Sequence, residues 1–287
     1  MFLTEYKTTC KNLFRSSVFW LSLCILLIIA IYEATEVSYA YFDPSIGETI
    51  WDNDPRYVLT FQTYVQTVMN ACVANIMLYG MPIVTVISTA LILFRDHRDG
   101  FFEIQKASGL RPHQYLLPHL SALLTINFVV AFLATELSLS FFVITRGGVD
   151  GYGLGFILLD SLVRVARVTA CIALPNLILY ISLTYAVGSV LKSSVAAAVA
   201  GFGYAIFFYA VNLMFRFRIA SWYFDYLSPL PQKPREFFLY FGSEWHEGII
   251  EMMGVTLGQA LLAIGCLAAF ALVYTMISYV CVKKRNI

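Results

Sequence analysis

Charged residues are scarce in this 287-residue chain: Asp, Glu, Lys and Arg make up 13% of it, whereas hydrophobic residues make up 59%. A soluble protein of this length needs a surface rich in Lys and Glu, so the composition argues against a soluble domain. The formal net charge is only +1, and no basic arm is present, which argues against binding of nucleic acid. We therefore expect a polytopic membrane protein that binds no nucleic acid.

Motifs for catalysis and metal binding are also missing. The chain has no G-x-x-x-x-G-K-[ST] phosphate loop, no G-x-S-x-G and no H-E-x-x-H. Its four histidines and six cysteines are dispersed without a C-x-x-C pair, so no metal site is expected and the cysteines are interpreted as small core residues. The sequence predicts neither an enzyme nor a cofactor bound by this chain.

Long apolar runs are what the chain has in abundance. Runs of about 20 apolar residues have the length of a helix that crosses the hydrocarbon core. Because backbone polar groups in lipid must be satisfied internally, we predict an all-α fold in a single domain, 1–287. The six predicted spans cover about 18–34, 71–94, 118–145, 168–190, 195–215 and 255–281. No A-x-A-like cleavage site follows the first of them, so we interpret it as a retained span rather than a signal peptide.

The distribution of Lys and Arg predicts the orientation of these spans. If the N-terminus, the segment 95–117, the turn at 191–194 and the C-terminus are cytoplasmic, eleven of the nineteen basic residues lie inside. Both termini would then be cytoplasmic, and the aromatic segment 216–254 would be an outer loop. The residues at about 5–17 alternate apolar and basic faces, which predicts a helix lying in the membrane interface, in contact with lipid. The expected location is the cell membrane of a prokaryote.

The segment RDHRDGFFEIQKASGLRPHQYLL, 95–117, is a charged interruption between the second and third spans. It predicts a short helix over about 96–108, with Asp96 as N-cap and Gly109 as a C-cap able to take positive φ. Pro112 would prevent its continuation. Because so short a helix is unstable alone and Phe101 and Phe102 would be exposed, we expect a protein partner. The alternative is a solvated loop that only connects two spans.

Residues 95–109 of this segment read R-D-x-R-D-G-F-F-E-I-Q-K-A-S-G, with Gly100, Glu103, Ser108 and Gly109 at the positions that define the pattern. The pattern resembles the coupling-helix segment of ABC-2 type transporter permeases. The predicted interfacial helix, the six spans and the aromatic segment between the last two spans resemble that family as well. The chain departs from the family pattern at Pro118 and His119, where relatives often place a Lys.

The resemblance implies a permease subunit that works with a second permease, identical or sister, and with two separate ATPase chains. ATP and magnesium would be bound by the ATPases. The coupling helix would dock into them through Phe101 and Phe102, with Asp99, Glu103 and Lys106 fixing its register. A permease of this kind would export an amphipathic peptide, a lipid-like compound or another hydrophobic compound. A membrane signalling or scaffold subunit coupled to an ATPase, and a secondary transporter, are the alternatives.

Glu136 falls in the outer part of the third predicted span, and Arg164 and Arg167 lie near the outer end of the fourth, whose helical periodicity continues upstream. Charges at membrane depth are costly, so each is a candidate functional residue. We predict that Glu136 neutralises Arg167 and that the group borders the substrate route. A purely structural ion pair is the alternative.

Overall fold

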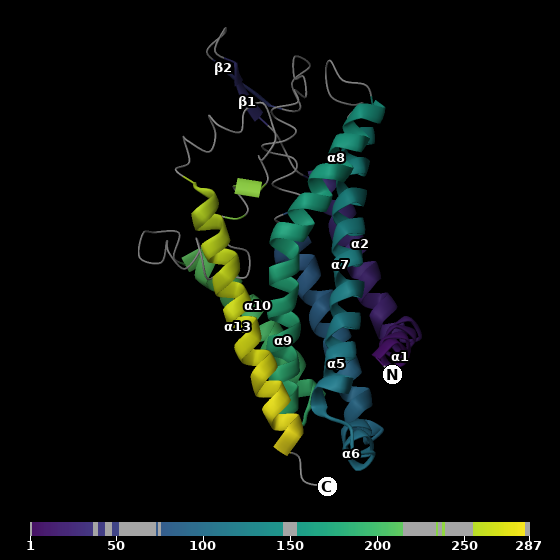
Figure 1. Cartoon of the computed structure of the whole chain (residues 1–287). Coiled ribbons are helices and arrows are strands. Elements are labelled where there is room, and N and C mark those ends of the chain that lie inside the picture. Colours follow the sequence, from purple (N-terminus) through teal and green to yellow (C-terminus); the bar gives the residue numbers. More distant parts are fainter. Residues whose placement is uncertain are drawn as a thin grey trace.

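The computed structural model describes residues 2–36, 40–43, 48–51, 73, 76–145, 154–214, 234, 237–238 and 255–284. This part of the chain is almost entirely helical, as predicted, and most of its helices run side by side along one direction (Figure 1). Four helices are long and apolar enough to cross a membrane, and a fifth candidate is a bent helix pair at the N-terminus. The long apolar helices are those of a membrane-embedded protein.

The bent pair consists of α1 (Phe2–Phe14) and α2 (Ser17–Glu36), whose axes differ in direction by 69°. The turn between them is held by the Ser16 amide, which donates to the Leu13 carbonyl at 3.0 Å, and by the Trp20 indole, which donates to the Phe14 carbonyl at 2.8 Å. The segment predicted at about 5–17 as a separate interfacial helix is therefore a helix of its own, set at a steep angle to the first apolar helix.

Two of the long helices begin with a wide π-helical turn. The first is η2 (Ile76–Gly80), followed by α5 (Met81–Arg98), and the second is η3 (Thr169–Ala173), between α8 (Leu154–Val168) and α9 (Leu174–Leu191). Pro82 and Pro175 are the second residues of α5 and α9, and a proline provides no N–H to the preceding turn. The wide turns lie where this donor is missing, so both helices continue through the prolines.

The remaining helices are α6 (Phe101–Ala107), α7 (Pro112–Thr145), α10 (Ser194–Met214) and α13 (Leu257–Lys284). Every predicted span coincides with a helix, although α10 counts only as a shorter apolar helix over Ser194–Phe207. α7 starts at Pro112, six residues before the predicted third span, because proline fits the first turn of a helix. Pro118 lies inside α7 without ending it.

The structure also contains a β-hairpin, which the sequence analysis did not predict. β1 (Ala40–Asp43) pairs antiparallel with β2 (Glu48–Trp51), Ala40 opposite Trp51 and Asp43 opposite Glu48. It lies at the end of the molecule where α8 begins, opposite the end that carries α6 (Figure 1). We call these two ends the hairpin end and the α6 end. The predicted outer loop 216–254 falls almost wholly outside the described residues.

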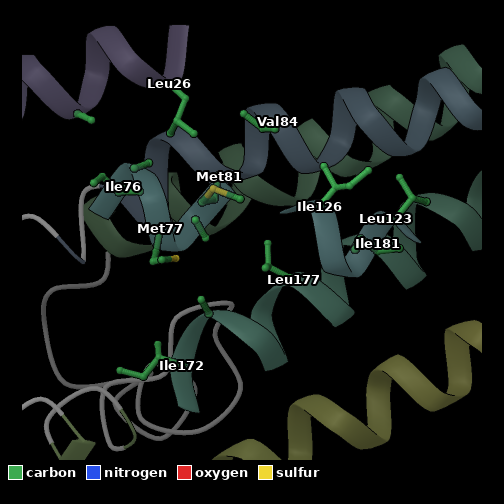
Figure 2. Packing of buried hydrophobic residues seen from close by; sticks show 14 of the residues in the cluster. Leu26, Ile76, Met77, Met81, Val84, Leu123, Ile126, Ile172, Leu177 and Ile181 are labelled. Atoms are coloured by element: carbon green, nitrogen blue, oxygen red, sulfur yellow. The ribbon is translucent and has the colours of Figure 1, made fainter. Parts of the chain in front are cut away.

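The core lies between α2, α5, α7 and α9. Leu26, Met81, Ile126 and Leu177, one from each helix, are buried and face a common interior (Figure 2). α9 is central, since it contacts α5, α7, α10 and α13. Because lipid is as apolar as these side chains, close van der Waals packing, rather than transfer from water, holds such helices together.

Candidate functional site

The short helix α6 connects α5 to α7 and is enclosed by two glycines in the left-handed backbone conformation. Gly100 has φ 61° and Gly109 has φ 73°, values that glycine adopts without the steric cost of a Cβ. After the last turn, the Leu110 amide donates to the Gln105 carbonyl at 3.2 Å, which is the six-to-one bond of a Schellman cap. The predicted role of Gly109 as a positive-φ cap is confirmed.

At the C-terminal end of α6, Ser108 Oγ donates to the Ile104 carbonyl at 2.9 Å and thereby contributes to the cap. The N-terminal end differs from the prediction. Asp96 is no N-cap, because it lies inside α5, and α6 begins only at Phe101. The predicted helix over 96–108 is therefore wrong at its start: its first residues complete α5, and Gly100 makes the turn between the two helices.

Phe101 attaches α6 to α7. Its ring stacks on His119 with centroids 4.9 Å apart and meets Tyr115 edge-on at 6.1 Å. Tyr115 and His119 are buried, and Phe101 itself is half-buried within its own chain, so the prediction of an exposed Phe101 is wrong. Among the described side chains of α6, the large apolar one that is exposed is Ile104, at 59%.

Beneath Phe101, a buried carboxylate meets a buried imidazole. Asp96 Oδ2 of α5 lies 3.2 Å from His119 Nδ1 of α7, and the two side chains are only 8% and 4% exposed. The pair is ionic when His119 is protonated. A buried carboxylate is tolerated only beside such a partner, so the contact fixes the ends of α5 and α7 against each other under α6.

The charges at the start of α6 are largely compensated within the chain. Arg98 Nε donates to Asp99 Oδ1 at 2.8 Å, and Arg95 Nε lies 3.7 Å from Asp99 Oδ2. The hydrogen bond from Arg98 is the main cause that lowers the pKa of Asp99 below its ordinary value. The side chains of three other predicted docking residues lie outside the described part: Phe102, Glu103 and Lys106.

α6 also contacts the N-terminal helix. Gln105 Nε2 donates to Glu5 Oε1 at 3.5 Å, which joins α6 to α1. A cavity of about 250 Å³ lies between α1, α5, α6 and α7, with Asn12, Asp96 and His119 among its lining residues. The seven-residue helix α6 thus lies against three longer helices, α5 by its connection, α7 through Phe101 and α1 through Gln105.

The second predicted group lies at the hairpin end, between α7 and α8. Glu136 Oε1 accepts hydrogen bonds from Ser161 Oγ at 2.9 Å and from Ser140 Oγ at 3.5 Å. Arg164 is buried, and its Nε lies 2.6 Å from Asp160 Oδ2, one helical turn away. The predicted pair of Glu136 with Arg167 is not formed among the described residues. Glu136 comes from α7 and the two arginines from the neighbouring α8. The partners that the structure shows are Ser140 and Ser161 for Glu136, and Asp160 for Arg164.

The sequence analysis did not identify the contact between Asp96 and His119. Each residue stands at the end of an apolar run, and His119 was noted as a departure from the family pattern. Their meeting depends on α5 continuing past Asp96 and on α7 starting early at Pro112. Neither boundary follows from helical periodicity.

No protein-family model matches the sequence, and no curated protein matches it.

Proposed function

We propose that this chain is the transmembrane subunit of an ATP-driven transporter of the ABC-2 permease type, with α6 as its coupling helix. The observation that supports this most is the construction of α6. It is separated from α5 by Gly100, capped at its C-terminal end by Gly109, packed on α7 through Phe101 and bonded to α1 through Gln105. A helix of this kind transmits force into long helices, whereas a solvated connection needs no such contacts.

The proposal places the α6 end in the cytoplasm. Arg95, Arg98, Arg111 and Lys192 lie there, together with the last two residues of α13, Lys283 and Lys284. Such an excess of basic residues is typical of the cytoplasmic side. The six spans would be α2, η2 with α5, α7, α8 with α9, α10 and α13. Two ATPase chains that carry ATP and magnesium, and a second permease, would complete the transporter in the cell membrane.

Because Phe101 is packed within the chain, the proposal assigns the contact with the ATPase to the exposed face of α6. Ile104 is a large apolar side chain exposed on that face. Its burial in a partner would contribute to docking through the apolar surface removed from water. Phe102, Glu103 and Lys106 remain predicted members of the same contact.

The proposed cargo is an amphipathic peptide, a lipid-like compound or another hydrophobic compound, moved outward. The polar group of Glu136, Arg164 and Arg167, set among apolar helices near the hairpin end, supports a route with both apolar and charged parts. The energy for export would come from the ATPases, since the chain has no phosphate-binding loop of its own.

The docking proposal is tested by purifying the tagged full chain from its native membranes and measuring the ATP hydrolysis that accompanies it. Ile104→Asp is expected to reduce the co-purifying activity by about tenfold or more, because it places a charge in an apolar contact. Val195→Asp is the matched control, since Val195 is 70% exposed and begins α10 at the same end of the molecule.

Absence of any co-purifying ATPase, or equal activity with Ile104→Asp and the unchanged chain, would contradict the coupling role. Sealed vesicles that contain the chain and its ATPase provide the second measurement. Outward movement of a hydrophobic compound that needs ATP supports the transporter. ATP hydrolysis without movement of any solute would instead favour the signalling or scaffold subunit.

A further inference from the structure

An apolar cleft lies between α7, α9 and α13 in the half of the molecule nearer the α6 end, and Phe2 at the start of α1 also lines it. Its volume is about 370 Å³, which is within the range of small-ligand sites. α9 forms the floor with Ile178 and Ile181, and α7 forms one wall with Leu117, Leu120 and Leu124. Leu117 is 50% exposed, so the cleft is open at its rim rather than sealed in the core.

The hydroxyl groups in this cleft are not available to a ligand as hydrogen-bond donors. Ser121 donates to the Leu117 carbonyl at 2.8 Å, Ser182 to the Leu179 carbonyl at 3.0 Å, and Thr275 to the Ala271 carbonyl at 2.8 Å. Each hydroxyl hydrogen is therefore used within its own helix. The lining presents hydrocarbon to an occupant, and a polar solute would lose its hydrogen bonds to water without replacement.

Cations surround the cleft on the side toward the α6 end. Arg111 immediately precedes α7, Lys192 immediately follows α9, and Lys283 and Lys284 end α13. Along the helix axes these residues lie about 9 to 15 Å from the lining residues. The stretches 108–113, 189–194 and 280–284 carry no Asp or Glu, so these three helix ends are uniformly basic.

We propose that the cleft binds an acyl chain of an anionic phospholipid from the leaflet at the α6 end, with the headgroup held by Arg111 and the lysines of α13. An acyl chain fits the hydrocarbon lining, and a negative headgroup complements the basic rim. The proposal depends on the chain lying in a membrane and not on its coupling to an ATPase. Failure of either proposal therefore leaves the other intact.

The experiment uses the full chain in lipid nanodiscs with a phosphatidylglycerol probe that carries a photoreactive diazirine on one acyl chain. The matched probe is phosphatidylcholine with the same acyl chain. Mass spectrometry of the cross-linked peptides is expected to place the phosphatidylglycerol label on α7 around Leu117–Leu124 and on α9 around Ile178 and Ile181. Labelling there is expected to exceed that by phosphatidylcholine by about fivefold for each basic contact.

Two variants and their controls separate the parts of the site. Ser121→Phe fills the cleft and is expected to reduce labelling about fivefold, whereas Thr125→Phe changes an exposed position one turn further along α7 and should not. Arg111→Gln combined with Lys283→Gln is expected to remove the preference for phosphatidylglycerol. Arg15→Gln, which removes an exposed cation beside α1, should retain it.

Three results would overturn the proposal. One is a label spread evenly over exposed apolar residues such as Val273 and Met276 of α13. Another is equal labelling by the two lipids in the unchanged chain. The third is a cross-link showing that a second copy of the chain, rather than lipid, occupies the cleft. If Ser121→Phe fails to fold, the Arg111 and Lys283 changes, which lie on the surface, still decide the outcome.

Discussion

Asp96 and His119 form the most consequential contact between individual residues in this protein. Both residues are buried, and Phe101 of α6 stacks on His119. Their contact joins α5 to α7, the two long helices that α6 connects in sequence. Because each group is nearly removed from solvent, each depends on the other for a polar partner. Loss of one should therefore cost more than the contact itself provides.

Asp96→Ala is expected to lower the free energy of unfolding by about 1 to 3 kcal/mol, because His119 would remain buried without its partner. The double variant Asp96→Ala with His119→Ala should lose less than the sum of the two single variants. Unfolding in mixed micelles, followed by circular dichroism, measures all three. Strict additivity would show that the two side chains do not interact.

Gly109 provides a second test at a single position. Nothing lies within 4 Å of where its Cβ would be, so the left-handed φ of 73° is what demands glycine. Gly109→Ala should destabilise the end of α6 by about 1 to 2 kcal/mol, and Gly109→Asn by less, because Asn tolerates this conformation. Faster hydrogen exchange over 101–110 in the Ala variant than in the Asn variant is the expected reading. Equal exchange in both would contradict the argument from φ.

Among the helices, the close approach of α10 to α5 and α9 depends on Gly201. A Cβ at this position would lie 2.6 Å from Val86 Cγ2 and 2.7 Å from Thr184 Oγ1, both of them stiff, buried, β-branched side chains. Val86 of α5 and Thr184 of α9 are therefore the neighbours that require glycine at this position.

Gly201→Ala is expected to lower the free energy of unfolding by about 1 to 3 kcal/mol through overpacking. Gly203→Ala, two residues away on the same helix, has nothing within 4 Å of its Cβ and should leave stability unchanged or slightly raised. The difference between the two variants, measured in the same micelles, isolates the contact. Equal effects would show that helix propensity, not packing, governs this position.

The positions of the helices were well predicted from the sequence, because a long apolar run in a membrane can form little other than a helix. Each predicted span coincides with a helix, whereas the ends next to Pro112 and Asp96 were misplaced. α6 ends before Pro112, as predicted, but the next helix begins at this proline rather than at 118, and Asp96 was interpreted as a cap although α5 continues past it. Both misplaced ends concern local choices that depend on tertiary packing.

For the candidate site, the sequence predicted the short helix that the structure shows as α6, but not its contacts. It indicated α6, its terminal glycine and the polar residues of α7 and α8. It could not indicate that Phe101 turns inward onto His119, because the two faces of a seven-residue helix look alike until a neighbour is in place. The hairpin was missed since four-residue strands leave little alternation to detect.

At the scale of the whole molecule, α7 sets the distance between the two ends. Its 34 residues extend about 50 Å, more than the roughly 30 Å hydrocarbon core. A cysteine placed at Ser108 and one placed at Thr145 should therefore lie on opposite sides of the membrane. In a cysteine-free background, a membrane-impermeant maleimide added to intact cells is expected to label Thr145→Cys and not Ser108→Cys. The reverse pattern would invert the proposed orientation.

The wide turns at η2 and η3 change the direction in which side chains point around the axis of the helices that follow. A π-helical turn holds one residue more than an α-helical turn, so the side chains on its two sides are offset by about 100° from a continuous α-helix. A single helical wheel drawn through 159–191 consequently assigns the wrong face to one side of η3. Tightening η3 to an α-helical turn without removing a residue would rotate everything beyond it by the same angle and carry buried side chains such as Tyr185 toward the lipid, whereas deleting one residue from the turn would restore an α-helix and keep those side chains on their face.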